Sequence, residues 1–419
     1  MPIASGVARF FAATGAAEAL RIPDYRRYWL SSGLTSFALN FWFLGAAWLV
    51  LELTDSPFAV GLVGGLAAAP SLLLSLLGGA IADRVDRRRL LVAARLGWTL
   101  QCAVGGLLVS GGRIEAWHVL ALTFAFGIAD AASTPAWQTL LVDIIGRSRL
   151  VSANALDQIA EFGGELIAPL IAGAIIASMG PAPLFYLAAA LLAVAALLMA
   201  LVRTRVPVLS IAEGHREVGP RRDVLAEIRA GLAYTARTPP FPALLAVSAL
   251  SLLSAAVFPL VPLYARDVLE VGPRGFGVMA AALAAGMLAG ALVMAALGEV
   301  GRPHRVMLVA RAAWFLAMAA FAVSEGFALS LTLLVAMGAS GAISGNLLVT
   351  QFQRHAEDRM RGRVMSIQRI ADSLEPVGAV VGGALASLLG PEPALLLCAA
   401  LGALALGAIT LGSPSLRRG

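Results

Sequence analysis

The sequence predicts an all-α integral membrane protein with twelve transmembrane helices, arranged as two pseudo-symmetric six-helix bundles. Three observations support this fold class. The 419 residues are 59% hydrophobic and only 13% charged, whereas soluble domains carry roughly 25% charged residues. Twelve apolar runs each approach or exceed the length of a membrane helix, which needs about 20 residues. One long polar segment divides these runs into six and six.

The first half contains six apolar runs separated by short turns. They cover residues 28–51, 57–81, 90–111, 116–142, 151–178 and 183–202. We expect them to form an N-terminal bundle over residues 1–206. The polar segment that follows has apolar residues at helical spacing over 222–237. It predicts a cytoplasmic linker over 207–240 that contains an amphipathic helix.

The second half repeats this pattern and predicts a C-terminal bundle over residues 241–419. Its runs cover residues 242–265, 274–297, 304–323, 327–352, 364–389 and 392–411. Glycines spaced four residues apart in both halves predict sites of close helix packing. These pairs are Gly61/Gly65, Gly286/Gly290 and Gly341/Gly345.

The arginines indicate the orientation of the chain. All 31 basic residues are arginine. With the N-terminus inside, the cytoplasmic segments and adjoining helix ends hold every arginine except Arg113, Arg266 and Arg274, as the positive-inside rule requires. We therefore expect a multi-pass protein of the cell or inner membrane with both termini in the cytoplasm. Because the arginines follow short loops rather than one face, the net charge of +6 does not indicate a nucleic-acid partner.

The two halves resemble each other in sequence. Arg95-Leu-Gly-Trp98 in the third predicted helix matches Arg311-Ala-Ala-Trp314 in the ninth. Duplicated bundles are typical of transporters, whose substrate site lies between the copies near the middle of the membrane. The repeat therefore predicts a transporter. For Arg95 and Arg311 we expect a part in cytoplasmic gating or a simple extension of the side chain toward the membrane surface.

The same repeat aligns acidic residues that lie in otherwise apolar surroundings. The alignment of the third and ninth helices places Asp83 over Glu299. The Gly-Pro pairs that end the fifth and eleventh helices place Glu165 over Glu375. Because both alignments match acid with acid, we interpret the halves as copies of one bundle.

The turn after the second predicted helix carries a recognisable motif. It reads Gly79-Ala-Ile-Ala-Asp83-Arg84-Val-Asp86-Arg87-Arg88. This run resembles the G-x-x-x-D-R-x-x-R-R signature of the major facilitator superfamily, and the resemblance covers essentially the whole chain. It implies alternating access by two six-helix bundles, usually driven by a proton gradient.

Physical chemistry suggests a gating role for this motif. A carboxylate at Asp83 can face the positive end of a neighbouring helix, and Arg84, Arg87 and Arg88 can pair with acidic groups and lipid phosphates. Such contacts could latch the cytoplasmic side shut. The alternative is that the arginines only anchor the topology. In the second half the motif is degenerate, and we expect any latch at Glu299 to be weaker.

Two further stretches narrow the resemblance to one branch. They are Pro135-Ala-Trp-Gln138 followed by Ala153-Asn-Ala-Leu156, and Arg361-Gly-Arg-Val-Met-Ser366. They resemble the drug and siderophore exporters, a branch that includes enterobactin and macrolide exporters.

The fifth predicted helix departs from the antiporter motif G-x-x-x-G-P-x-x-G-G. It keeps Gly164, Pro169 and Gly173 but has alanine at two of the glycine positions. Small residues still permit close helix contact. The arginine that many proton antiporters carry in the fourth helix is missing, and Asp130 lies in that region instead. The coupling mechanism can therefore differ from theirs.

Three carboxylates lie on one face of the fifth predicted helix. Asp157, Glu161 and Glu165 follow each other at intervals of one turn, from the cytoplasmic mouth toward the middle of the membrane. A charged group at the bilayer centre costs about 2.5 to 3.5 kcal/mol and usually faces a cavity or a partner. We predict functional roles for Glu161 and Glu165, whereas Asp157 is near enough to the cytoplasm to cap or solvate the helix.

The eleventh predicted helix carries a comparable stripe, formed by Gln368, Asp372 and Glu375. Our hypothesis is that Glu165, Glu375 and Asp130 form an acidic centre that takes up protons or pairs with a cationic substrate. Asp372 is a further candidate. The alternative is a structural role, in which Asp372 pairs with Arg369 one turn away.

Uncharged polar residues also occur in the helices expected to line the cavity. They are Asn40, Gln138, Asn346 and Gln351. Each could touch the substrate, but hydrogen bonding between helices is an equally good interpretation.

The sequence predicts a transporter rather than an enzyme. It contains no phosphate-binding loop, no H-E-x-x-H, no C-x-x-C and no G-x-S-x-G motif, and its four histidines are scattered. We therefore expect no cofactor and no metal. The predicted function is proton-coupled efflux of small amphipathic compounds, cationic or zwitterionic, by a monomer in contact with membrane lipids. The alternatives are a siderophore or lysophospholipid transporter, and a membrane receptor or assembly protein that transports nothing.

Overall fold

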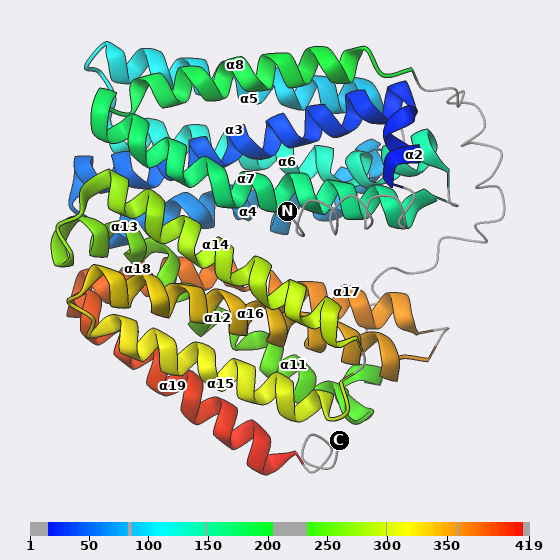
Figure 1. The fold of residues 1–419 in the computed structure, drawn as a ribbon, viewed down its shortest axis with the longest axis vertical. Helices are drawn as coiled ribbons and strands as arrows, with labels where there is room; N and C mark the ends of the chain where they lie inside the picture. Colours follow the sequence, from blue (N-terminus) through cyan, green and yellow to red (C-terminus); the bar gives the residue numbers. More distant parts are fainter. Residues whose placement is uncertain are drawn as a thin grey trace, which may run out of the picture. The chain divides into compact units, whose positions relative to one another are not determined.

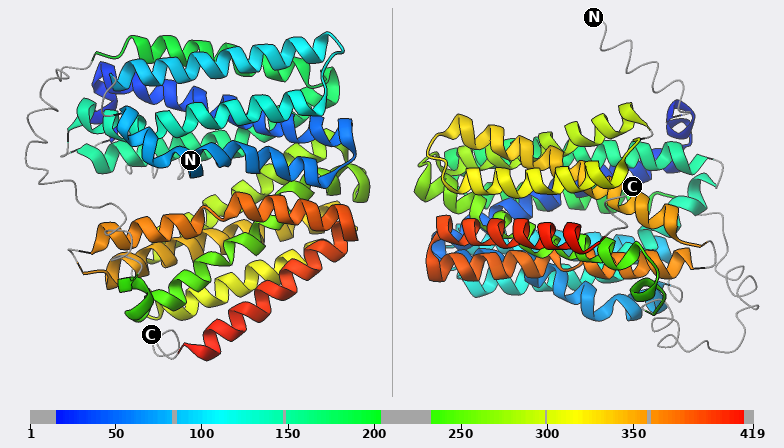
Figure 2. Two further views of the ribbon diagram at one scale, coloured as in Figure 1. Left: turned by 180° about the vertical axis from the view of Figure 1, so that it is seen from behind. Right: turned by 90° about the horizontal axis from the view of Figure 1, so that it is seen from below.

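The computed structural model describes residues 16–82, 86–146, 149–203, 233–298, 300–357 and 360–413, and these are helical with short connections. The chain divides into two compact units. The first comprises Met1–Leu49 and Leu66–Glu217, and the second comprises Val50–Gly65 and Val218–Gly419. Within each unit the long helices run side by side (Figures 1 and 2).

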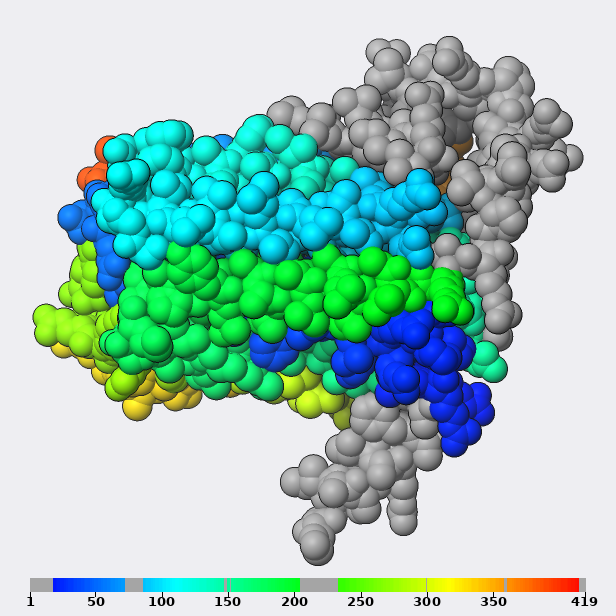
Figure 3. All heavy atoms as spheres, turned by 90° about the horizontal axis from the view of Figure 1, so that it is seen from above, coloured from blue at the N-terminus to red at the C-terminus, as the bar shows by residue number. Residues whose placement is uncertain are grey.

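The first unit holds four complete long helices and most of two others. Its elements are α2 (Ala16–Arg21), most of α3 (Pro23–Thr54), the later part of α4 (Pro57–Ala82), α5 (Arg87–Ser110), α6 (Ala116–Ile145), α7 (Leu150–Met179) and α8 (Ala182–Ala200). On one face of this unit α5 and α8 pack side by side along their length (Figure 3). Tyr25, Tyr28 and Trp137 stack in its core, which ties α3 to α6.

The second unit holds the remaining elements. They are α11 (Phe241–Ala249), α12 (Ser251–Ser254), η2 (Ala255–Leu260), α13 (Val261–Leu263), η3 (Tyr264–Val268), α14 (Gly272–Leu297), α15 (Pro303–Ala322), α16 (Phe327–His355), α17 (Arg361–Asp372), α18 (Glu375–Leu389) and α19 (Pro391–Gly412). It also includes the segment Val50–Gly65, from the end of α3 and the start of α4.

The predicted fold class is confirmed. Among the described residues, 11 helical spans are long and apolar enough to cross a membrane, and α4 adds the shorter apolar stretch Pro57–Ser71. Each apolar run identified in the sequence falls on a helix or a helical span. Most of the predicted linker lies outside the described residues, as does its amphipathic helix except for residues 233–237, which are helical.

Two of the predicted helices are interrupted. The run over 242–265 forms the consecutive short elements from α11 to η3, with Pro259 inside the 3-10 turn and Pro262 in α13. Proline lacks a backbone N–H and clashes with the preceding turn, so it breaks a regular helix. The run over 364–389 divides into α17 and α18 at Ser373 and Leu374, directly before Pro376 in the first turn of α18. This break separates Asp372 from Glu375.

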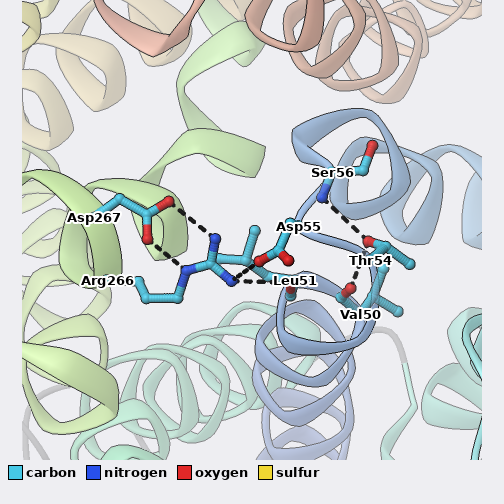
Figure 4. A network of polar contacts seen from close by, with 7 residues as sticks. All are labelled: Val50, Leu51, Thr54, Asp55, Ser56, Arg266 and Asp267. Carbon is cyan, nitrogen blue, oxygen red and sulfur yellow. Dashed lines mark hydrogen bonds and ion pairs between the residues drawn. The ribbon is translucent and has the colours of Figure 1, made fainter.

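A network of polar contacts fixes the segment Val50–Gly65 within the second unit (Figure 4). The guanidinium of Arg266 in η3 donates to Asp55 Oδ1 at 2.8 Å, to Leu51 O at 3.0 Å and to Asp267 Oδ1 at 2.6 Å. The N–H of Phe58 donates to Ser387 Oγ of α18 at 3.1 Å. The predicted topology places Asp55, Arg266 and Asp267 in outer turns, and Leu51, Phe58 and Ser387 at the outer ends of predicted helices.

Glycine permits close helix packing in the second unit. A Cβ on Gly286 of α14 would lie 2.1 Å from the backbone oxygen of Val335 in α16, and one on Gly338 would lie 2.1 Å from that of Leu283. These backbones therefore touch where only glycine fits. The packing role predicted for the pair Gly286/Gly290 is confirmed, since Gly290 makes the same kind of contact with Ala339. By contrast, a Cβ on Gly345 of α16 would meet nothing within 4 Å.

Gly286→Ala should destabilise the second unit because the added methyl group collides with backbone rather than with a movable side chain. Overpacking of this kind costs about 1–3 kcal/mol. Thermal unfolding of the purified protein in detergent should begin at a lower temperature for Gly286→Ala than for the control Gly345→Ala. Equal unfolding temperatures for the two variants would contradict the packing described here.

Candidate functional site

The first unit contains a cavity of about 410 Å³ between α3, α5, α6 and α7. Its volume is within the range of small-molecule sites. The wall is formed by Ser32, Thr35, Ser36, Leu39, Asn40, Phe43, Leu91, Arg95, Trp98, Asp130, Ser133, Thr134, Trp137, Asp157, Ala160, Glu161 and Glu165. The cavity thus combines aromatic and apolar side chains with hydroxyl groups, four carboxylates and one guanidinium.

The carboxylates come from two helices. Asp130 is on α6, and Asp157, Glu161 and Glu165 follow one another along α7. The structure therefore brings together three residues that the sequence singled out: Asp130, Glu161 and Glu165. Among the described residues, none of the four carboxylates forms an ion pair.

Asp157 is the most buried of these acids. It is 8% exposed, and neither of its carboxylate oxygens accepts a hydrogen bond from a described residue. The hydroxyl of Tyr25 donates to the backbone oxygen of Ala153 at 3.0 Å and also lies close enough to Asp157 to interact with its carboxylate. A buried carboxylate without a partner carries a free-energy cost that a bound proton or a bound cation removes. The sequence analysis assigned Asp157 only a capping or solvating role.

Arg95 on α5 lines the same cavity. It is 3% exposed, and its Nε donates to the hydroxyl oxygen of Thr35 on α3 at 3.1 Å. Its Nη1 donates to Leu91 O, one turn earlier, at 3.4 Å. No carboxylate of the described residues lies within ion-pair distance of it. The buried guanidinium thus belongs to the wall of the cavity.

The second unit repeats part of this arrangement. Arg311, the counterpart of Arg95, is also buried, and its Nη1 donates to the hydroxyl oxygen of Ser254 on α12 at 3.3 Å. Unlike Arg95, it interacts electrostatically with Glu375 and Asp372. In both halves a buried arginine therefore donates to a hydroxyl group of the first helical span of that half. Only the arginine of the second unit has carboxylates near enough to interact with its charge.

The alternative interpretation of Asp372, pairing with Arg369, is wrong. Asp372 accepts a hydrogen bond from the hydroxyl of Ser248 on α11 at 2.6 Å and another from the amide of Gln368. Its ion pair with Arg369 is absent from the described part of the chain, in which Arg369 is exposed. The one-turn separation allowed the pair, but the side chain of Asp372 reaches α11 instead.

The other predicted polar residues differ in position. Asn40 lines the cavity, and its amide donates to Ser36 O at 2.9 Å. Gln138 is exposed and does not contribute to this cavity wall. In the second unit Asn346 is exposed, whereas Gln351 is 2% exposed and its side-chain nitrogen has no partner among the described residues.

The motif after α4 lies partly outside the described residues, which leave out Asp83, Arg84 and the second-half residue Glu299. Gly79 is in α4. Arg87 pairs with Asp143 near the end of α6, with Nη1 and Oδ2 2.5 Å apart. Arg88 donates to the backbone oxygen of Val202 at 2.9 Å, just after α8. Both arginines therefore join α5 to other helices of the first unit.

The modified motif on α7 still makes a close helix contact. A Cβ on Gly164 would lie 2.5 Å from Ser36 Oγ on α3. Pro169 is inside α7, and the two alanines that replace glycines, Ala168 and Ala172, are fully buried. Gly173 is buried as well. Alanine is thus small enough to be buried at both glycine positions of the motif, as expected.

Sequence reasoning missed three charged residues of the first unit. The sequence predicts gating or surface extension for Arg95 and capping or solvation for Asp157, and it predicts no role for Asp143; none of these interpretations anticipates the burial of Arg95 and Asp157 in a cavity wall. One signal was available for Arg95, since an arginine in the middle of an apolar run is costly unless it faces a cavity or a partner. For Asp143 the signal was weaker, because only the fold brings it to Arg87.

Comparison with known proteins agrees with this architecture. A family model described as a transmembrane secretion effector matches residues 14–418. The chain belongs to the transmembrane secretion effector family. This family is a branch of the major facilitator superfamily, so the predicted resemblance is confirmed.

Curated relatives of this family member are exporters. It is 26% identical over 381 residues to proteins named enterobactin exporter EntS from Shigella boydii serotype 18 and from Escherichia coli O139:H28. Each alignment covers 88% of this chain and 86% of the relative. The chain is therefore a multi-pass membrane transporter of small molecules and not an enzyme. The orientation of its termini stays a prediction.

Solved structures share the fold at low sequence identity. The nucleoside transporter NupG matches with a TM-score of 0.70 at 14% identity, covering 93% of this chain and 98% of that one. A bacterial homologue of the iron transporter ferroportin matches with a TM-score of 0.66 at 16% identity, covering 93% of this chain and 99% of that one. These likenesses support the twelve-helix transporter fold.

Asp143→Asn should lower the free energy of unfolding, because it leaves the guanidinium of Arg87 partly buried without its anionic partner. Hydrogen bonds to charged groups contribute about 1.5–3 kcal/mol. The side chains of this pair are 19% and 24% exposed. The pair Arg149 and Glu18, 4.0 Å apart and 49% and 67% exposed, provides a matched control.

Thermal unfolding of Asp143→Asn, Arg87→Gln and the double variant should show coupling between the two positions. Glu18→Gln should leave the unfolding temperature nearly unchanged, since exposed pairs contribute little. The assignment fails if Asp143→Asn is no more destabilising than Glu18→Gln.

Proposed function

We propose that the protein is a proton-coupled exporter of small amphipathic compounds that carry a positive charge. The observation that supports this most directly is the gathering of four carboxylates around one cavity of about 410 Å³. None of them has an ion-pair partner among the described residues, where the buried carboxylate of Asp157 has the hydroxyl of Tyr25 as a neutral neighbour.

The uncompensated carboxylates suggest how proton and substrate exchange. A carboxylate that holds a proton is neutral and attracts a cation weakly, whereas an ionised one attracts it strongly. Protons and a cationic substrate therefore compete for Asp130, Asp157, Glu161 and Glu165. A proton entering from outside releases the substrate there, and loss of that proton to the cytoplasm restores the site.

The remainder of the wall supports an amphipathic substrate. Phe43, Trp98 and Trp137 line the cavity together with Leu39 and Leu91. Aromatic faces attract cations and pack against apolar ring systems. A compound with an apolar body and a cationic group would match both parts of the wall.

In the second unit Glu375 and Asp372 stay candidates for coupling. Asp372 already has two hydrogen-bond donors, and both acids interact with Arg311. We therefore expect their neutralisation to affect coupling less than neutralisation of Glu165 or Asp157.

Transport can be tested in everted membrane vesicles energised with a proton gradient, by following internal pH while cationic, neutral and anionic amphiphiles are added. Tetraphenylphosphonium should discharge the gradient in vesicles with the unmodified protein. With Glu165→Gln or Asp157→Asn, discharge should fall to the level of vesicles that lack the protein, because the exchangeable charge is reduced. Glu325→Gln, at an exposed position outside the cavity, is the matched control and should behave like the unmodified protein.

Full gradient discharge by both cavity variants, at equal protein levels, would contradict the proposal. If no compound discharges the gradient in any vesicle preparation, proton-coupled export of cations is wrong, and so is the role assigned to the acidic cavity.

A second candidate is export of a siderophore. It is supported by the 26% identity to enterobactin exporters over 381 residues. The same vesicles distinguish the two candidates, because a catecholate siderophore is anionic. Uptake of radiolabelled siderophore without uptake of tetraphenylphosphonium would favour this second candidate.

A further inference from the structure

Arg95 is a buried cation that lacks an anionic partner in an otherwise acidic cavity. Its Nε donates to the hydroxyl of Thr35 and its Nη1 to Leu91 O, whereas Nη2 makes no hydrogen bond with a described residue. A guanidinium that is 3% exposed needs charge compensation, because its transfer from water is costly. Neither partner supplies it, since a hydroxyl group and a backbone oxygen are both neutral.

Asp157 presents the opposite charge in the same cavity, and its carboxylate has the neutral hydroxyl of Tyr25 beside it but no cationic partner among the described residues. It comes from α7, whereas Arg95 comes from α5. Tyr28 interacts electrostatically with both, but the two do not form an ion pair. The two most buried charges of this cavity are therefore of opposite sign, lie on separate helices and form no ion pair with a described residue.

We propose that Arg95 binds the anionic group of a zwitterionic amphiphile whose cationic group lies on the carboxylates of α7. This inference rests on the proposed function of the cavity as the site of the transported compound. The planar guanidinium suits a carboxylate, because its donors form a fork that matches the two oxygens. A ligand with one carboxylate and one ammonium group compensates Arg95 and Asp157 at once, whereas a simple cation leaves Arg95 unpaired.

Arg311 is a second buried arginine of the same chain, which also forms no ion pair among the described residues but has two carboxylates near enough to offset part of its charge. It is held by the hydroxyl of Ser254, as Arg95 is by that of Thr35, but Asp372 and Glu375 interact with its charge. Binding of an external anion should therefore be less favourable at Arg311 than at Arg95. This makes Arg311 the matched control for a variant at Arg95.

The test uses a zwitterion and the cation obtained by masking its acid. Ciprofloxacin and its methyl ester have the same ring system and the same ammonium group, and only the former has a free carboxylate. Dissociation constants of both are measured by fluorescence with the purified full-length protein in lipid nanodiscs. Arg95→Gln should weaken binding of ciprofloxacin by about tenfold or more, because a charge-assisted bond is lost. Binding of the ester should stay the same or become tighter, since a positive charge is removed from the cavity.

Two further variants keep the test decisive. Arg311→Gln should leave the ratio of the two dissociation constants unchanged. Arg95→Lys retains the charge but not the fork, so its preference for the zwitterion should lie between those of the unmodified protein and Arg95→Gln. This variant gives the answer if Arg95→Gln does not fold.

Other outcomes would overturn the inference. If both compounds lose affinity equally in Arg95→Gln, or the ratio stays constant in all variants, Arg95 is not the anion subsite. In that case binding of the ester to the unmodified protein still supports the proposed function. If the unmodified protein binds neither compound, the inference and the proposed function fail together.

Discussion

Charge buried inside a membrane protein has to be compensated, and in this chain the first unit leaves that compensation incomplete. Four carboxylates and one arginine share a cavity in which no ion pair joins described residues. An isolated charge in such surroundings costs several kcal/mol unless a partner or water satisfies it. The missing partners are supplied, in our proposal, by protons and by the transported compound. Helix α3 positions the charged helices around the cavity. Its Thr35 accepts a hydrogen bond from Arg95 of α5, and its Ser36 packs closely against Gly164 of α7.

The two halves of the chain carry a matching pair of buried arginines in different surroundings. Arg95 and Arg311 occupy matching places and both bind a hydroxyl group of the first helical span of their half. In the second unit, however, Asp372 already has hydrogen-bond donors and Arg311 has acidic neighbours. In our proposal the exchangeable charge is therefore concentrated in the first unit. The halves also differ in helix continuity. The first span of the second half is broken on either side of α12, and the eleventh predicted helix is broken before α18, whereas the corresponding helices α3 and α7 of the first half are continuous.

The fold could be predicted from the sequence because apolar length and arginine placement are local signals. The acidic face of α7 was predictable for the same reason, since residues four apart lie on one helix face. The pairing of Arg87 with Asp143, by contrast, joins residues 56 positions apart and depends on how α5 packs on α6. The cavity position of Arg95 depends similarly on α3, and the burial of Asp157 depends on the helices packed around α7, which its position near the helix end does not reveal. The prolines Pro259, Pro262 and Pro376 themselves indicate breaks in their helices. The expectation of continuous helices followed instead from the length of the apolar runs.

The central claim is that protons and a cation compete for the uncompensated carboxylates of the first unit. It is tested most directly by measuring proton release when tetraphenylphosphonium is added to the purified protein in weakly buffered detergent solution. The account predicts protons released in proportion to the cation bound, with a smaller release from Asp157→Asn than from the unmodified protein. Binding of the cation without any release of protons would contradict the account.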